Sequence, residues 1–238
     1  MFCAPFSISA WANPDNITAN HTPAGVFDDA ASAVDALYLS FAGATGGDPV
    51  QAISASSGTF AVASSTAGFS AGSWQHGCAV FAATNSRAAY YNGANKGTNT
   101  TSNTPSGISR TILGKFNSNS TNASTDFVLA EVGMWNVALT DDEALTLSQG
   151  FSPLLVRPQS LVAYWPLYGR AGASGGEESW VGAFPLTHAN SPAVVDHPPR
   201  IIYPSRPRII IPAAAVGGFQ AAWARGANSI IGVGARAA

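Results

Sequence analysis

Glu131 is the first residue to consider for acid–base chemistry, because it is a lone carboxylate in the most apolar segment of the chain, residues 127–136. Hydrolysis of a glycosidic bond uses two carboxylates about 5–10 Å apart across a cleft. No second carboxylate lies on the same segment as Glu131. We therefore predict no catalytic residue and no enzymatic activity, and we expect Glu131 to be an inward polar group hydrogen-bonded near a helix.

The histidines, serines and cysteines do not show the patterns of a metal-binding site or of a nucleophilic catalytic site. The histidines lack the spacing of metal sites, and no Gly-x-Ser-x-Gly or P-loop pattern occurs. Cys3 and Cys78 are too few for a disulfide framework or a four-cysteine zinc site. We interpret both cysteines as small buried hydrophobes or free thiols, and we predict no cofactor.

Calcium is the one ion that the sequence leaves open. Asp28 and Asp29, together with Asp35 and Asp48, carry carboxylate oxygens that suit calcium at a loop rim. The alternative, which we favour, is that these are solvated surface carboxylates. Asp28 and Asp29 are thus the calcium candidates of a chain for which we predict no metal site.

Three aromatic residues are candidates for stacking against a sugar. They are Trp74, Tyr90 and Tyr91. Because neighbouring residues of a strand point to opposite faces, at least one of the adjacent tyrosines must be buried. We expect Trp74 and one tyrosine to lie in the core, and we keep Tyr90 and Tyr91 as possible glycan contacts.

The charge pattern separates a body from a C-terminal tail. Charged residues make up only 10% of the chain, and the formal net charge is −2. Residues 180–238 nevertheless carry five arginines against the single acid Asp196. Some of these arginines alternate with isoleucine and tyrosine, which favours an acidic protein surface over nucleic acid as the partner. The apolar stretch 213–233 is interrupted by Gln220, Arg225 and Asn228, so we predict no membrane span.

Short alternating segments between turn-forming clusters predict strands rather than helices. Asn92-Gly93 is a typical hairpin dipeptide and predicts that a strand pair continues to about Gly97. A short helix follows Thr140, whose capping box with Glu143 marks its start, and Gly150 ends it. The predicted strands are 6–12, 36–42, 51–55, 59–63, 74–82, 87–91, 110–115, 127–136 and 161–167.

The C-terminal segment has a different character. Seven prolines between residues 185 and 212 exclude a helix or a central strand, so residues 197–212 must be extended. An extended segment of this kind cannot bury its own apolar side chains and must lie along another surface. We predict an anchoring arm whose contact residues are Arg200, Ile201, Ile202, Tyr203, Arg206, Arg208, Ile210, Phe219 and Trp223.

Five sequence motifs in order resemble the laminin-G-like, concanavalin A-like jelly-roll superfamily: FSISAW, WQHGCAVF, AAYYNG, TILGK and AEVGMWNVALTDDE. The resemblance implies an all-β sandwich of two antiparallel sheets with one short helix over residues 1–168, followed by a Pro/Arg-rich arm over 169–238. It implies that the last strand of the body lies beside the first, and that His76 is a packed core residue. Only a few residues precede the first strand, so we expect the tail or a neighbouring chain to complete a sheet edge. Ala130 stands where many relatives have aspartate, which argues against a transferred metal site.

A second resemblance concerns residues 150–170 and 196–204, which are similar to segments of phage virion proteins. It implies a non-enzymatic structural protein of a bacteriophage particle, a capsid decoration or accessory protein assembled in the host cytoplasm. The partners would be major capsid or tail proteins and further copies of the chain in a homo-oligomer. The alternative is a lectin-like module of a tail fibre or adhesion protein that binds host surface polysaccharide.

Overall fold

The computed structural model describes residues 4–28, 34–116, 127–169, 176–188, 193–198 and 200–204, and the backbone of 220–222 and 232–234. The chain divides into two compact units, Met1–Pro204 and Ser205–Ala238. In the second unit, β12 (Gln220–Ala222) pairs antiparallel with β13 (Gly232–Gly234). All other elements belong to the first unit.

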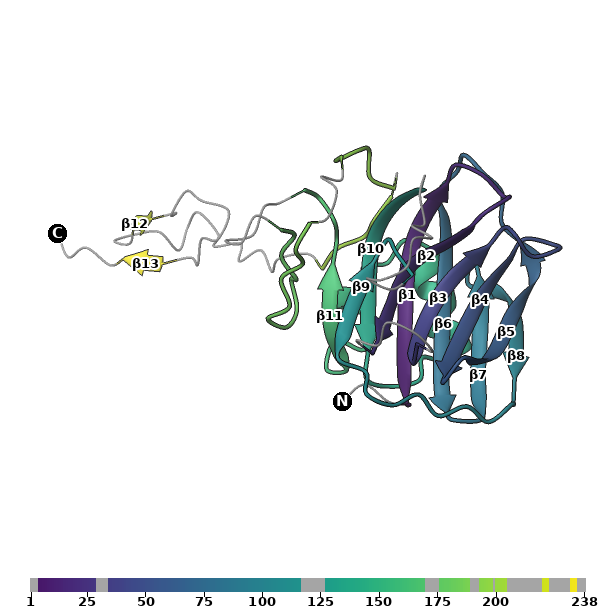
Figure 1. Cartoon of the computed structure of the whole chain (residues 1–238). Coiled ribbons are helices and arrows are strands. Elements are labelled where there is room, and N and C mark those ends of the chain that lie inside the picture. Colours follow the sequence, from purple (N-terminus) through teal and green to yellow (C-terminus); the bar gives the residue numbers. More distant parts are fainter. Residues whose placement is uncertain are drawn as a thin grey trace. The chain divides into compact units, whose positions relative to one another are not determined.

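The first unit is a sandwich of two antiparallel sheets (Figure 1). The all-β jelly-roll fold with one short helix is therefore confirmed. The six-stranded sheet has the order β11-β10-β1-β6-β7-β8, with β1 Phe6–Pro14, β6 Gln75–Ala83, β7 Ser86–Tyr91, β8 Ala94–Asn99, β10 Phe127–Trp135 and β11 Leu161–Trp165. The five-stranded sheet has the order β5-β4-β3-β2-β9, with β2 Asn20–Phe27, β3 Ala36–Ala42, β4 Pro49–Ser56, β5 Thr59–Gly68 and β9 Arg110–Leu113.

Strand β2 is the one strand of the sandwich that the sequence patterns did not predict. Its sequence NHTPAGVF contains Pro23 and Gly25, both unfavourable in a strand interior. The pairing with β3 shifts register between His21 and Ala24, and this irregularity accommodates the proline. A Cβ atom at Gly25 would lie 2.5 Å from the Cβ of Tyr38, so close packing explains the glycine. Tertiary contacts here override local propensity.

The main core lies between the two sheets. Alternating residues of β1, from Phe6 to Ala12, point inward and are at most 1% exposed. They pack in one cluster with Leu39 and Phe41 of β3. Burial of apolar surface on this scale is the main favourable contribution to folding.

Helix α1 (Asp141–Ser148) and the 3-10 helix η1 (Pro153–Leu155) cover the outer face of the six-stranded sheet. The predicted capping box is present: the Thr140 hydroxyl accepts from the Glu143 backbone N–H, and the Glu143 carboxylate accepts from the Thr140 N–H. Leu147 packs in the cluster that contains the fully buried Cys78. Burial, with a smaller contribution from Glu143, raises the pKa of the Cys78 thiol to about 12, while Cys3 lies outside the described residues.

His76 is a core residue. It is fully buried in β6, its Nε2 lies 2.8 Å from the Ser9 hydroxyl, and its ring centroid lies 5.5 Å from that of Trp11. Burial penalises the imidazolium ion and lowers the pKa of His76 to about 3.

The edges of the two sheets meet along β5 and β8. Gly97 of β8 is in such close contact with β5 that a Cβ atom would lie 1.6 Å from the Ser64 carbonyl oxygen. Only a residue without a side chain fits this backbone approach.

We predict that Gly97→Ala lowers the free energy of unfolding by about 1–3 kcal/mol, because the methyl group must displace backbone. Urea denaturation monitored by tryptophan fluorescence measures the change. Gly46→Ala is the matched control, since a Cβ atom at Gly46 would meet nothing within 4 Å. Equal stability of the two variants would contradict the close approach of β5 and β8.

We predict that His76 contributes to acid sensitivity. Between pH 6.5 and 3 the unfolded chain binds a proton at this histidine and the folded chain does not, so stability is complete above pH 6.5 and falls as the pH is lowered. The slope from this group approaches about 1.4 kcal/mol per pH unit. Urea titrations at several pH values should show a shallower acid decline for His76→Gln than for the wild type. The exposed His188→Gln serves as control, and identical slopes in all three proteins would refute the prediction.

Candidate functional site

The most distinctive polar site lies at the β10–β11 edge of the six-stranded sheet and is centred on Glu131. The Glu131 side chain belongs to β10 and the residue is 1% exposed. Its backbone has a φ of 54°, in the left-handed region that non-glycine residues rarely adopt. The pairing of β1 with β10 shifts between Ser9–Gly133 and Trp11–Ala130, so Glu131 lies in a β-bulge. Such strain costs about 1–3 kcal/mol and persists only where the surroundings stabilise it.

Both carboxylate oxygens of Glu131 have partners. Oε2 accepts a hydrogen bond from the Tyr164 hydroxyl at 2.8 Å, and Oε1 accepts one from the Tyr203 hydroxyl at 2.6 Å. His197 Nε2 lies 3.2 Å from Oε1 and 3.1 Å from the Pro166 carbonyl oxygen. We call Glu131, Tyr164, His197 and Tyr203 the Glu131 cluster. Glu131 was predicted to be inward and hydrogen-bonded, but its partners come from β11 and the C-terminal segment and not from the helix.

Further aromatic rings surround the Glu131 cluster. Tyr168 stacks on His197 with ring centroids 4.4 Å apart, and its hydroxyl is hydrogen-bonded to that of Tyr203. Trp180 lies 5.7 Å from Tyr164 and 6.1 Å from Tyr203, measured between ring centroids. Burial, followed by the nearby Glu131 carboxylate, raises the pKa of Tyr164 and Tyr203 above that of free tyrosine. Both phenols therefore remain neutral donors to the carboxylate.

The described residues between 176 and 204 form a closing segment that extends the edge of the sheet. The Trp180 N–H donates to the Tyr164 carbonyl oxygen at 2.8 Å, and Val181 forms a bridge with Tyr164. Farther along, the Ile202 N–H donates to the Gly150 carbonyl oxygen at 2.7 Å, and the Ile202 carbonyl oxygen accepts from Ser152 N–H at 2.9 Å. The closing segment thus pairs with the β11 edge at Tyr164, which is one of the two ways in which a sheet edge was expected to be completed. The boundary predicted after residue 168 lies inside the compact unit, which extends to Pro204.

The structure describes only part of the predicted anchoring arm. Arg200 and Ile202 are exposed, while Ile201 and Tyr203 are half-buried. Tyr203 contacts its own sandwich through Glu131 and is not a free anchoring side chain. The other predicted contacts lie outside the described residues: Arg206, Arg208, Ile210, Phe219 and Trp223.

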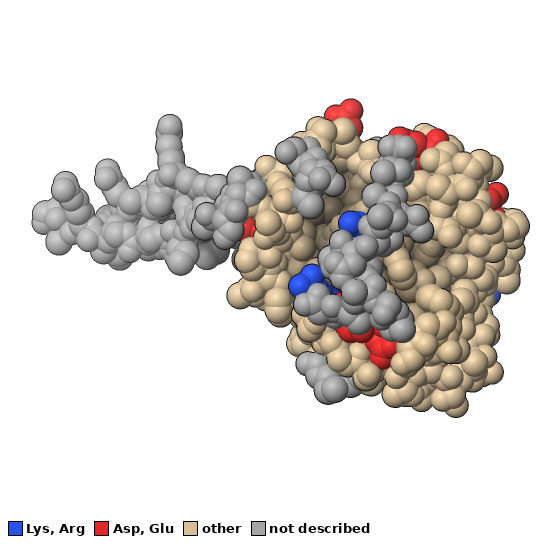
Figure 2. Space-filling view, viewed as in Figure 1, with Lys and Arg blue, Asp and Glu red and all other residues tan. Residues whose placement is uncertain are grey.

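Exposed apolar side chains are concentrated on the closing segment. Val194 lies close to Gly169, since a Cβ atom at Gly169 would be 2.2 Å from it, and the neighbouring Tyr168 contacts the Trp180 ring. We call the five exposed apolar residues of the closing segment the apolar strip. Their exposed fractions are Trp180 41%, Phe184 47%, Val194 66%, Val195 52% and Ile202 40%. The face of the body seen in Figure 2 shows only scattered charged groups.

The tyrosines predicted as glycan contacts do not form an open platform. Tyr90 is 2% exposed under helix α1, and its hydroxyl donates to Asp141 at 2.7 Å. Tyr91 is half-buried, packs against the main core and donates to Gln75 Oε1 at 2.5 Å. Trp74 is half-buried. Contact of Tyr90 or Tyr91 with a glycan stays a prediction without a visible binding surface.

The calcium candidates are not assembled into a site in the part of the chain that the structure describes. Asp29 lies outside it, and no group of three potential metal ligands occurs within it. Asp35 instead accepts hydrogen bonds from the backbone N–H groups of Ser57 and Ser106, each at 2.6 Å. Although burial opposes them, these hydrogen bonds hold the pKa of Asp35 below its usual range. No described helix is long and apolar enough to cross a membrane.

We predict that Tyr203→Phe lowers the free energy of unfolding by about 1–3 kcal/mol, because it removes a donor from a buried carboxylate. The closing segment should also become more susceptible to limited proteolysis, with cleavage sites mapped by mass spectrometry. Tyr91→Phe is the matched control, since it loses one hydrogen bond to the neutral Gln75. Wild-type protection of the closing segment in Tyr203→Phe would show that Glu131 does not hold it.

Solved structures with a similar fold have low sequence identity to the chain. A pentraxin from Limulus polyphemus is 14% identical with a TM-score of 0.41, covering 60% of this chain and 69% of that one. A sialidase from Trypanosoma rangeli is 16% identical with a TM-score of 0.45, covering 60% of this chain and only 22% of the sialidase. Domain 4 of an arabinanase from Geobacillus stearothermophilus is 20% identical with a TM-score of 0.46, covering 61% and 66%.

The family assignment comes from the sequence of the sandwich. No curated protein sequence matches the chain. Residues 3–144 match the model of the family described as the concanavalin A-like lectin/glucanases superfamily, which agrees with the two-sheet fold. The chain therefore belongs to the concanavalin A-like lectin/glucanases superfamily.

Proposed function

We propose that this protein is a non-enzymatic structural protein of a bacteriophage particle, a capsid decoration or accessory protein. The sandwich is displayed, and the C-terminal region attaches it to other virion proteins and to further copies of the chain. The protein resides in the virion after assembly in the host cytoplasm. The observation that carries this proposal is the apolar strip on the closing segment.

The apolar strip has the character of a contact surface. Its five large apolar side chains lie within residues 180–202, and each is at least 40% exposed. Exposed apolar side chains that gather in one segment of a soluble domain are candidates for an interaction site. The Glu131 cluster holds Tyr203, at the end of the closing segment, on the sandwich. Little conformational entropy is then lost when a partner covers the strip.

The residues that follow Pro204 have a sequence suited to attachment. Residues 205–238 contain four arginines and no acidic residue, together with Phe219, Trp223 and several isoleucines. A partner that complements them must offer acidic groups and apolar surface together. The resemblance of residues 150–170 and 196–204 to segments of phage virion proteins, taken from the sequence alone, is the reason for proposing the particle as the setting.

The environment of Glu131 supports a structural role over a catalytic one. A catalytic carboxylate must contact substrate, whereas Glu131 is 1% exposed and both of its oxygens are hydrogen-bonded to tyrosines.

We predict that deleting residues 205–238, or introducing Trp180→Asp with Val194→Asp, reduces incorporation into particles at least tenfold. Particles are produced in cells that supply each variant in place of the wild type, purified, and quantified by mass spectrometry. Circular dichroism of each purified variant checks that the sandwich is folded. Phe60→Asp is the control, because Phe60 is 52% exposed on β5, outside the strip. Wild-type incorporation of the folded deletion and strip variants would refute the proposal.

A second function, glycan binding by the sandwich, is favoured by the family match over residues 3–144. The displayed body then adheres to host surface polysaccharide as a lectin-like module of a tail fibre or adhesion protein. Saturable binding of the full chain on a glycan array supports this function, and an array without signal counts against it.

A further inference from the structure

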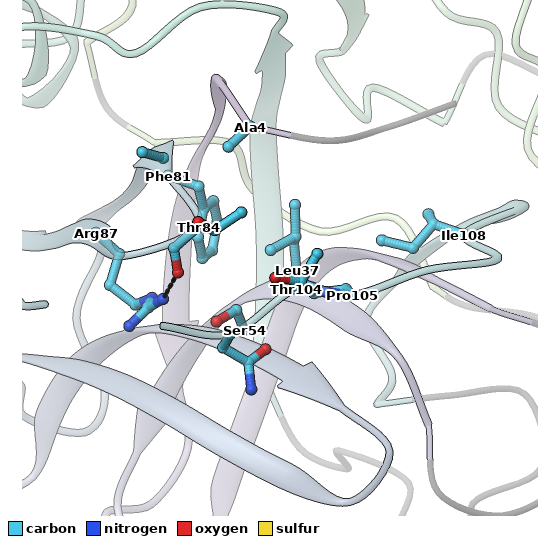
Figure 3. Close-up of a pocket in the computed structure, with 11 residues that line it drawn as sticks. Ala4, Leu37, Ser54, Phe81, Thr84, Arg87, Thr104, Pro105 and Ile108 are labelled. Atoms are coloured by element: carbon cyan, nitrogen blue, oxygen red, sulfur yellow. Dashed lines mark hydrogen bonds between the residues drawn. The ribbon is translucent and has the colours of Figure 1, made fainter. Parts of the chain in front are cut away.

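A cavity of about 50 Å³ lies at one end of the sandwich, where β4 and β7 face each other (Figure 3). Leu37, Phe81 and Ile108 supply apolar walls, and the exposed Thr84 and Thr104 lie at its rim. The volume exceeds the roughly 10–15 Å³ that a single water needs, so the cavity has room for a small molecule. Three of its lining residues are polar and buried: Ser54, Arg87 and Asn103.

Arg87 is a buried cation bonded to neutral acceptors. The residue is 3% exposed, its Nη2 donates to the Thr84 carbonyl oxygen at 2.7 Å, and its Nη1 donates to Asn99 Oδ1. Its Nε has no hydrogen-bond partner among the described residues. Burial lowers the pKa of Arg87, and no described charged group contributes to the shift. Buried arginines are ordinarily paired with an anion, so this one lacks its usual counterpart.

The other two polar residues of the cavity also carry unpaired atoms. Ser54 is 2% exposed and Asn103 is 7% exposed, and neither Ser54 Oγ nor Asn103 Oδ1 has a partner among the described residues. The Asn103 amide nitrogen already donates to the Thr59 carbonyl oxygen at 3.0 Å, which fixes the other amide atom as an acceptor. A buried polar atom without a hydrogen-bond partner destabilises the folded state. The residues that line this cavity thus carry three unpaired groups: the Nε–H donor of Arg87, the Oδ1 acceptor of Asn103 and the hydroxyl of Ser54.

We infer that the cavity binds a small hydroxycarboxylate. The carboxylate accepts from the free Nε–H of Arg87 and from the remaining N–H of Nη2, since the guanidinium edge matches a planar carboxylate. The ligand hydroxyl donates to Asn103 Oδ1, and the Ser54 hydroxyl donates to the carboxylate. Chloride and sulfate fit less well, because they bring no hydroxyl hydrogen to the Asn103 acceptor. This site is independent of the proposed attachment to particles.

Three ligands of about equal size separate the contributions to binding. We expect glycolate to bind the full-length protein with a Kd at least tenfold lower than that of acetate, which lacks the hydroxyl, or glycolamide, which lacks the charge. Chemical-shift changes of the arginine Nε–H signals at constant ionic strength measure the affinities. Equal affinities for the three ligands, or no binding, would overturn the inference and leave the cavity to water. Galacturonate, a sugar acid, distinguishes two sources of the ligand. If galacturonate binds with an affinity similar to that of glycolate, the natural ligand is the acid group of a sugar. If galacturonate does not bind, the natural ligand is a free small acid.

Variants place the ligand in this cavity. Arg87→Met should weaken glycolate binding at least tenfold, and Ser54→Ala, which removes only a hydroxyl, about threefold or more. Arg157→Met is the control, because Arg157 is exposed and pairs with Glu143 outside the cavity. Wild-type affinity in a folded Arg87→Met protein would overturn the assignment. If Arg87→Met does not fold, the decision rests on Ser54→Ala, whose unchanged affinity would overturn it equally.

Discussion

The buried carboxylate of Glu131 joins the closing segment to the last strand of the sandwich. A buried charge is tolerated only when hydrogen bonds replace its lost hydration. The Glu131 donors are Tyr164 on the last sandwich strand and Tyr203, thirty-nine residues farther on. The Nε2 atom of His197 lies 3.2 Å from the carboxylate oxygen that Tyr203 binds. The closing segment is therefore a necessary part of the body, because without Tyr203 and His197 one oxygen of the carboxylate would lose the partners it has here.

Local patterns predicted most of the sandwich but not the site. Alternation identified the inward face of β1, and the capping box at Thr140 identified the helix, because both signals lie within a few neighbouring residues. Strand β2 was missed because Pro23 and Gly25 break its pattern. The expectation that the last strand lies beside the first was wrong, since β10 separates β11 from β1. The Glu131 cluster unites residues up to 72 positions apart, and no local pattern encodes such a contact.

Two buried charges in the same sandwich are stabilised in different ways. Glu131 receives phenol donors from its own chain, and a left-handed backbone conformation is tolerated to hold it. Arg87 donates hydrogen bonds to two neutral acceptors, and its Nε has no partner among the described residues. This arrangement is expected for a site with room for an external anion. The two groups differ in their surroundings. The closing segment covers the carboxylate of Glu131, whereas a cavity lies next to the guanidinium of Arg87.

Structure and hydrolysis compete for the same carboxylate in this fold. For Glu131 to act as an acid or base it would have to leave Tyr164 and Tyr203, and the closing segment would then lose one of its polar attachments to the sandwich. The strained backbone at Glu131 would lose the contacts that compensate for it. In this chain the Glu131 carboxylate is used to hold the closing segment, and this contact also fixes the apolar strip at the edge of the sheet. That use of the carboxylate leaves hydrolysis without a free acid at this site and agrees with the binding role proposed for the strip.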